Sequence, residues 1–138
     1  MSTLVTEQPG LVHVLEVAVS DQHTPAAARH WLTSELAGLV PQDTVDDAEL
    51  IVSELVTNAV RHAGGRILAS VQLVDGGVRV TVHDHGSAGE WAAPGGESAG
   101  RGRGLIIAMA LAVVDVSTGL SGTTVTALIQ RSAIGAAA

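Results

Sequence analysis

Four polar residues in the stretch ELIVSELVTNAVRHAGG have the types and the spacing of a binding surface. Glu54, Thr57, Asn58 and Arg61 fall at i, i+3, i+4 and i+7, so a helix places all four on one face over two turns. Glu54 has the chemistry of a general base, and the amide oxygen of Asn58 suits Mg²⁺, which takes its other ligands from water and phosphates. Thr57 is a small polar filler in this interpretation. The alternative is a solvated helix face in which Glu54 and Arg61 form a weak pair.

A second candidate is HDHG (residues 83–86), where an expected strand ends. Asp84 stands at the strand end, where a carboxylate can orient a ligand, and Gly86 allows a flat group to approach the backbone. One alternative is that Asp84 only caps a turn. Another is a metal-dependent hydrolase that uses His83 and His85, which share a strand face, together with His62.

A third candidate is the glycine-rich stretch SAGRGRGL, which comes directly before an apolar, helix-like run. Gly100, Gly102 and Gly104 allow successive backbone N–H groups to converge on an anion, and the helix start adds its dipole. Arg101 and Arg103 add positive charge. The spacing of these glycines does not fit a dinucleotide-binding fingerprint. Two interpretations of the stretch stay open: a general phosphate-binding loop and a flexible linker.

Apolar periodicity and turn residues predict the elements that must position these residues. A capping box of Thr44 and Asp47 starts the central helix, Gly64-Gly65 ends it, and Thr24 caps an earlier helix. The expected order is a strand at 11–20, helices at 24–39 and 44–63, strands at 66–74 and 78–84, a helix at 104–114, and strands at 114–118 and 123–130.

Hairpin-linked strands with helices between the groups indicate an α+β two-layer sandwich. The length of 138 residues indicates one domain, at 11–131, with an N-terminal lead at 1–10 and a flexible tail at 132–138.

Composition excludes several classes of function. A formal net charge of −7, with only 1% aromatic residues, argues against a nucleic-acid partner. The absence of cysteine and lysine excludes thiolate chemistry, Schiff bases and the usual P-loop. The longest apolar run, LIIAMALAVV, is shorter than a membrane span, and the start of the chain has no signal pattern. We therefore expect a cytoplasmic protein with no membrane partner.

Taken together and in this order, the motifs resemble the histidine-kinase-like ATPase superfamily, also called GHKL or the Bergerat fold. ELVTNAVRHA is similar to its N box, DHG at 84–86 to its first glycine box and GRGRGL at 100–105 to its second. GTTVTAL at 122–128 is similar to its terminal strand. The likeness is greatest to small stand-alone anti-sigma-factor serine/threonine kinases, which have the E-x-x-T-N-A entry and lack a phosphoacceptor-histidine domain.

The resemblance implies a mixed, mostly antiparallel sheet with helices on one face and a Gly-rich ATP lid. It implies that Glu54 is the catalytic base, that Asn58 holds Mg²⁺, and that Arg61 contacts phosphate. Asp84 then accepts the adenine amino group, and Gly86 packs beside it.

The remaining implied contacts with ATP come from the lid and the last strand. Thr123 matches the adenine-side threonine, with Thr124 as its competitor. The lid residues around the phosphates are Gly100, Arg101, Gly102, Arg103, Gly104 and Leu105.

The activity implied is that of a bacterial ATP–Mg²⁺-dependent protein kinase in transcriptional control. It would transfer the γ-phosphoryl group to a serine or threonine of an antagonist protein, and its ATP-bound form would hold a sigma factor. The family likeness also implies a homodimer. The alternative is a nucleotide-gated protein-binding module with ATP binding or slow ATPase activity but no kinase activity.

Overall fold

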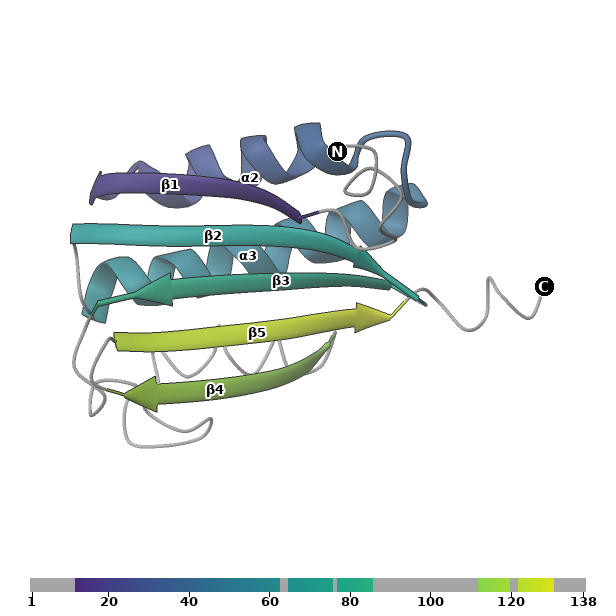
Figure 1. Ribbon diagram of the computed structural model, residues 1–138. Coiled ribbons are helices and arrows are strands. Elements are labelled where there is room, and N and C mark those ends of the chain that lie inside the picture. Colours follow the sequence, from purple (N-terminus) through teal and green to yellow (C-terminus); the bar gives the residue numbers. More distant parts are fainter. Residues whose placement is uncertain (1–11, 63–64, 76, 86–111, 120–121, 131–138) are drawn as a thin grey trace, which may run out of the picture.

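A computed structural model describes residues 12–62, 65–75, 77–85, 112–119 and 122–130. This part of the chain forms two helices and five strands (Figure 1). In chain order they are β1 (Val12–Ser20), α2 (Thr24–Leu36), α3 (Gln42–His62), β2 (Gly65–Val74), β3 (Gly77–Asp84), β4 (Val113–Gly119) and β5 (Gly122–Gln130).

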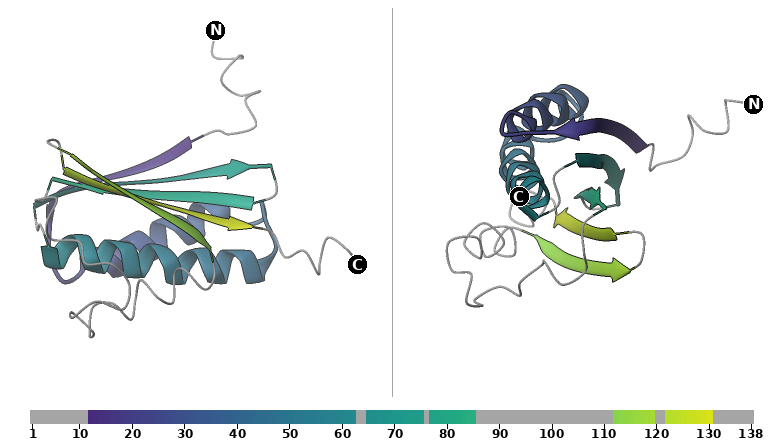
Figure 2. Two further views of the ribbon diagram at one scale, coloured as in Figure 1. Left: turned by 90° about the horizontal axis from the view of Figure 1, so that it is seen from below. Right: turned by 90° about the vertical axis from the view of Figure 1, so that its left-hand side faces the viewer.

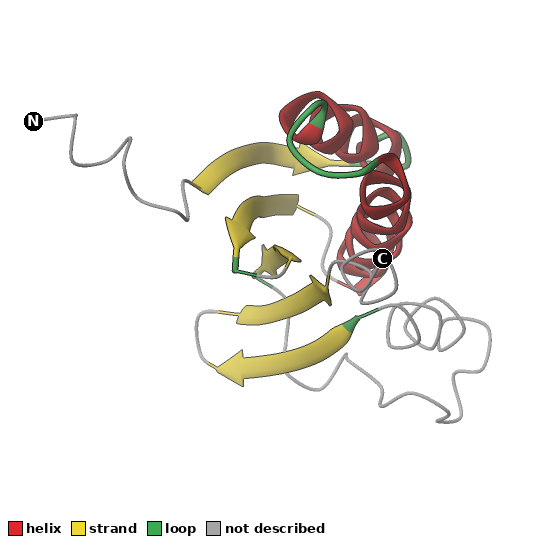
Figure 3. Cartoon of the chain, turned by 90° about the vertical axis from the view of Figure 1, so that its right-hand side faces the viewer, coloured by secondary structure: helices red, strands yellow, loops and turns green. Residues whose placement is uncertain are grey.

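The five strands form one sheet in the order β1-β2-β3-β5-β4. All four pairings are antiparallel, so the expected mixture with parallel strands is not found among the described strands. β3 and β5 are neighbours although 37 residues separate the end of one from the start of the other. Both helices lie against the same face of the sheet (Figures 2 and 3), which confirms the predicted two-layer α+β architecture.

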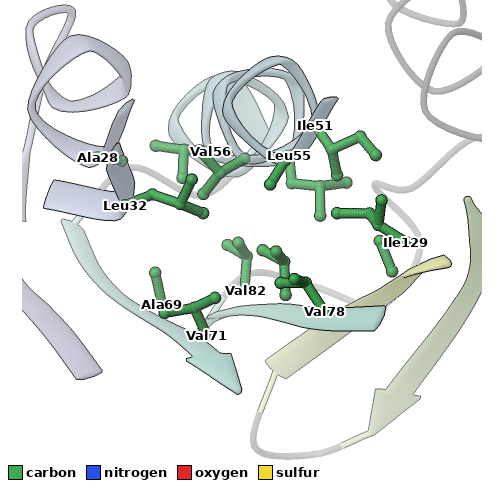
Figure 4. Close-up of a cluster of buried hydrophobic side chains, with 14 of the residues drawn as sticks. Ala28, Leu32, Ile51, Leu55, Val56, Ala69, Val71, Val78, Val82 and Ile129 are labelled. Carbon is green, nitrogen blue, oxygen red and sulfur yellow. The ribbon is translucent and has the colours of Figure 1, made fainter. Parts of the chain in front are cut away.

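The core lies between the helices and the sheet, and its fully buried hydrophobic residues in the described ranges are all aliphatic (Figure 4). In β3, Val78, Val80 and Val82 alternate with more exposed residues, as expected for a strand with one covered face. From α3, Leu55 is fully buried against them. Burial of each such side chain contributes about 1.5–3 kcal/mol, far more than an exposed polar pair on the same helix, so the core fixes where α3 lies.

The start of α2 differs slightly from the expected cap. His23 is the N-cap residue, and Thr24 is already helical with Pro25 beside it in the first turn. The hydroxyl of Thr24 accepts a hydrogen bond from the backbone N–H of Asp21 at 2.9 Å, outside the helix. Thr24 therefore fixes the preceding turn instead of capping the helix.

The capping box predicted for α3 is wrong. The helix begins at Gln42, and the backbone carbonyl of Pro41 accepts hydrogen bonds from the N–H groups of Thr44 (3.0 Å) and Val45 (3.1 Å). Thr44 is inside the first turn and only 3% exposed, so its hydroxyl is not at the helix end.

The predicted helix at 104–114 falls mostly outside the described residues, but its last two residues belong to a strand. Val113 and Val114 open β4, where Val114 pairs with Ala127 and packs against the core. β-Branched residues fit a pleated, half-buried surface well, and this explains why these two valines belong to a strand and not to the predicted helix. Across the described ranges, no helix has the length and hydrophobicity needed to cross a membrane.

Candidate functional site

The ends of three elements lie at the same end of the molecule: the last turns of α3, the end of β3 and the start of β5 (Figure 1). Asp84 is the last residue of β3, and it is paired with Thr123 of β5. Each follows the strand alternation onto the face that the helices cover, in line with the buried Val82 and Val125. The two polar side chains therefore lie on the same covered face, on neighbouring strands.

Both residues of this pair are buried although both are polar. Asp84 is 2% exposed and Thr123 is 1% exposed. In the described part of the chain, the hydroxyl oxygen of Thr123 has no hydrogen-bond partner. Leaving a buried hydroxyl unpartnered is unfavourable by about 1–3 kcal/mol, and most such groups in folded proteins are satisfied. A ligand that hydrogen-bonds there would relieve this penalty.

Gly122 allows β5 to start directly against the end of β3. Its φ is +125°, and a Cβ at this position would overlap the backbone carbonyl oxygen of Asp84. Only glycine combines this backbone conformation with so close an approach. The sequence did not single out Gly122 as a candidate, although a glycine at the very start of a strand was the available signal.

The adjacent pair on the other face of the sheet is built differently. Nδ1 of His83 and Oγ1 of Thr124 form a hydrogen bond of 2.7 Å. The rings of His83 and His85 meet edge to face, with their centroids 5.0 Å apart. Thr124 therefore lies on the opposite face from Asp84, and Thr123 is the threonine beside that carboxylate.

The alternative of a histidine metal site finds no support in the described ranges. Within them, no cluster of three or more His, Cys, Asp or Glu side chains is arranged to hold a metal ion. The side chain of His62, the third ligand in that alternative, is outside the described residues.

The polar stripe of α3 divides between two surfaces. Asn58 is only 5% exposed, and Glu54 is half-buried. Thr57 and Arg61 line a groove between α2 and α3, whereas neither Glu54 nor Asn58 lines it. Successive helix residues are separated by 100°, so a stripe at i, i+3, i+4 and i+7 is wide enough to reach both surfaces.

Comparison with known proteins identifies the family. The family model described as "Histidine kinase-like ATPase domain" matches residues 17–129. The chain belongs to the histidine kinase-like ATPase family.

Solved structures of similar fold agree with this histidine kinase-like ATPase assignment. The crystal structure of the RsbU and RsbW domains of Rv1364c from Mycobacterium tuberculosis is similar at 25% identity and a TM-score of 0.64, covering 86% of this chain and 32% of that one. The blue-light activated histidine kinase EL346 from Erythrobacter litoralis is similar at 30% identity and a TM-score of 0.55, covering 66% of this chain and 31% of that one.

The histidine kinase domain of EL346, solved separately, has 22% identity and a TM-score of 0.52, and it shows the fold alone. That match covers 83% of this chain and 64% of that one. The chain thus spans about a third of the first two structures and less than two thirds of this one.

The predicted likeness to the superfamily and to its anti-sigma-factor kinase type is confirmed, and membership of an ATPase family implies nucleotide binding. The predicted lid residues lie outside the described ranges, so their contacts stay predictions. They are Gly100, Arg101, Gly102, Arg103, Gly104 and Leu105, and Gly86, expected beside the base, also lies outside the described ranges.

Proposed function

We propose that this histidine kinase-like ATPase binds ATP and Mg²⁺ and acts as a protein serine/threonine kinase in transcriptional control. The observation that carries the proposal is the buried pair of Asp84 and Thr123, where a carboxylate adjoins a hydroxyl that has no partner in the described ranges. The pair lies at the end of the molecule where α3 ends (Figure 1).

The buried pair fits the edge of an adenine base. An ionised carboxylate only accepts hydrogen bonds, so Asp84 would accept one from the exocyclic amino group. A hydroxyl both donates and accepts, so Thr123 can donate to a ring nitrogen or bond an intervening water. The bond to Thr123 would satisfy a buried hydroxyl that has no partner in the described ranges, and this favours the base over a purely aliphatic ligand.

The polar stripe of α3 supplies residues suited to the phosphates. The amide oxygen of Asn58 would hold Mg²⁺, an ion that needs few protein ligands when phosphates and water provide the others. When bound, ATP with Mg²⁺ supplies the transferable γ-phosphoryl group. Glu54 would accept the proton of the partner's serine or threonine hydroxyl as that oxygen bonds to the γ-phosphorus, while the bond from this phosphorus to the bridging oxygen breaks and ADP leaves. Arg61 lines the groove toward α2, so we assign it no phosphate contact.

We propose the remaining contacts and partners as the family resemblance implies them. The glycines and arginines of the lid would surround the phosphates, and Gly86 would pack beside the base. The protein partners would be a sigma factor and an antagonist that carries the phosphorylated residue, and the chain would act as a homodimer in the cytoplasm.

One observation favours a second function, a nucleotide-gated binding module without kinase activity. Among the described residues, no hydrogen bond or ion pair orients the carboxylate of Glu54. Catalytic bases are commonly oriented by a further group, although such contacts often tighten only in the reacting complex.

The decisive experiment is phosphoryl transfer from labelled ATP to a partner recovered with the protein. We expect Glu54→Gln to lower transfer about a hundredfold or more while ATP affinity stays within about twofold. Glu16→Gln is the matched control, because it removes the same charge from an exposed residue of β1. Nucleotide-dependent partner binding without any transfer would instead establish the binding module.

A further inference from the structure

The groove between α2 and α3 carries a charge opposite to that of the whole chain. It has a volume of about 340 Å³, and two of its lining residues are Arg29 and Arg61. No aspartate or glutamate of the described ranges lines it, in a chain with 14 acidic and seven basic residues. The charged side chains that line the groove are therefore both cationic.

Arg29 is held in place to receive an anion. One of its terminal nitrogens, Nη1, donates a hydrogen bond to the hydroxyl of Ser53 at 2.9 Å. This bond joins α2 to α3 and uses one of the five guanidinium donors, so four remain for a planar partner such as a carboxylate. Because the side chain is already ordered, less conformational entropy is lost when the anion binds.

The rest of the groove sets further requirements on the ligand. Arg61 is exposed on α3, so its charge is accessible from solvent, and Thr57 lines the groove beside it. Pro25 and Val60 contribute apolar surface to the same groove. A group that combines a carboxylate with a neighbouring aliphatic side chain satisfies both parts of this surface.

We infer that the α2–α3 groove docks an acidic segment of a protein partner, with a carboxylate between Arg29 and Arg61 and an aliphatic side chain against Val60. The inference rests on the proposed function only in that the chain acts on a protein. Thr57 and Arg61 belong to the same two turns of α3 as Glu54 and Asn58. A helix is about 10–12 Å across, so a segment docked there lies beside the residues proposed to act on phosphate and hydroxyl.

The test measures binding of a fluorescein-labelled peptide of alternating leucine and glutamate, by fluorescence anisotropy and without nucleotide. We expect the protein to bind this peptide and to bind the version with glutamine in place of glutamate at least tenfold more weakly. Arg61→Glu should weaken binding of the glutamate peptide at least tenfold. Arg79→Glu is the matched control, since Arg79 is exposed on β3 and the change in net charge is the same.

Arg29→Lys provides a second variant that keeps the charge but loses the planar donor set. We expect it to weaken peptide binding several-fold, whereas a purely long-range charge effect would leave binding unchanged. Circular dichroism checks that each variant is folded.

Several outcomes would overturn the inference. They are no binding at about millimolar peptide, equal binding of the glutamine peptide, or an equal loss in Arg79→Glu. Displacement of the peptide by inorganic phosphate alone would make the groove a small-anion site and would also overturn it.

Failure of the inference and failure of the proposed function can be told apart. Asp84→Asn should lower ATP affinity without changing peptide binding, because Asp84 does not line the groove. A protein that binds the peptide but no ATP would contradict only the proposed function. A protein that binds ATP but no acidic peptide would contradict only the docking site.

Discussion

Two neighbouring residue pairs of β3 and β5 have the same composition of one titratable residue and one threonine, yet they differ in almost every physical respect. Asp84 and Thr123 are buried on the face that the helices cover, and the hydroxyl of Thr123 has no partner in the described ranges. His83 and Thr124, one residue away on each strand, lie on the other face and bond each other at 2.7 Å.

The difference distinguishes a completed structural contact from a candidate binding site. On the face opposite the helices (the open face), the His83 ring and the Thr124 hydroxyl satisfy each other by their hydrogen bond. The pair on the covered face holds a buried hydroxyl whose hydrogen-bonding capacity the described residues leave unused. Each pair joins one titratable residue to one threonine, so burial and hydrogen-bond partners, and not this composition, mark the covered pair as the candidate binding site.

The largest expected effect is on stability and comes from disrupting the close approach of Gly122 to the backbone carbonyl of Asp84. Gly122→Ala should lower the free energy of unfolding by about 3 kcal/mol or more, because it combines a positive φ with overlap of the Asp84 carbonyl. Gly38→Ala is the control: φ is +78° and nothing lies within 4 Å, so only about 1–2 kcal/mol should be lost. Chemical denaturation measures both, and equal losses would contradict the overlap.

The next effect concerns the carboxylate itself. Asp84→Asn should lower ATP affinity at least tenfold, about 1.4 kcal/mol, because one charge-assisted hydrogen bond to the base is lost. His83→Asn, the neighbouring residue on the open face, should leave the affinity unchanged. Titration calorimetry decides, and an unaltered affinity in Asp84→Asn would refute the adenine assignment.

The two threonines allow the comparison to be tested by the same substitution on each face. Thr124→Val should lower the free energy of unfolding by about 1 kcal/mol through loss of its bond to His83, with ATP affinity unchanged. Thr123→Val should leave stability unchanged or slightly higher and lower ATP affinity by about 1 kcal/mol. If both variants changed the same quantity, the two faces would not differ as described.

The smallest expected effect is far from either pair, near the start of α3. Burial raises the pKa of Asp47, and the nearby carboxylates of Asp43 and Asp46 raise it further. The folded state therefore holds this proton more tightly than the unfolded state, so the ionised group is destabilising above the folded-state pKa. Below the ordinary carboxyl pKa of about 4 this penalty disappears.

Asp47→Asn should accordingly raise the free energy of unfolding by about 0.3 kcal/mol at neutral pH, as for removal of a like-charge pair at i, i+4. The gain should vanish at about pH 3. ATP affinity should not change at all. Urea denaturation at the two pH values checks the sign, and a loss of stability at neutral pH would contradict it.

Much of the fold could be predicted from local patterns, because alternation and helical spacing report which side chains are buried. The boundaries could not. Thr44 was expected to cap α3, but tertiary packing buries it within the first turn and leaves the Pro41 carbonyl to begin the helix. Val113 was expected to belong to a helix and Val114 to lie where that helix meets the next strand, but both pair with β5 across the hairpin and belong to β4.

The candidate site was predicted in part. Thr123 was expected from the family resemblance with Thr124 as its competitor, and the burial pattern of β5, in which Thr123 shares the covered face with Val125 and Ala127, decides between them. The contact of Gly122 with Asp84 could not be foreseen, since it depends on the register between β3 and β5.

Nor could the sequence show that the polar stripe of α3 divides between two surfaces. The position of α2 decides which residues line a groove, and helix spacing alone does not give that position.

The central helix α3 is continuous over 21 residues, or about 31 Å, and its last turns reach the proposed nucleotide site. A ligand bound at that end would stabilise the same helix that packs against the aliphatic core. Any tight binder should therefore raise the melting temperature, with about 2.7 kcal/mol gained at a hundredfold excess over its Kd. Heating small samples with a panel of nucleotides would rank them by that rise before any partner protein is in hand.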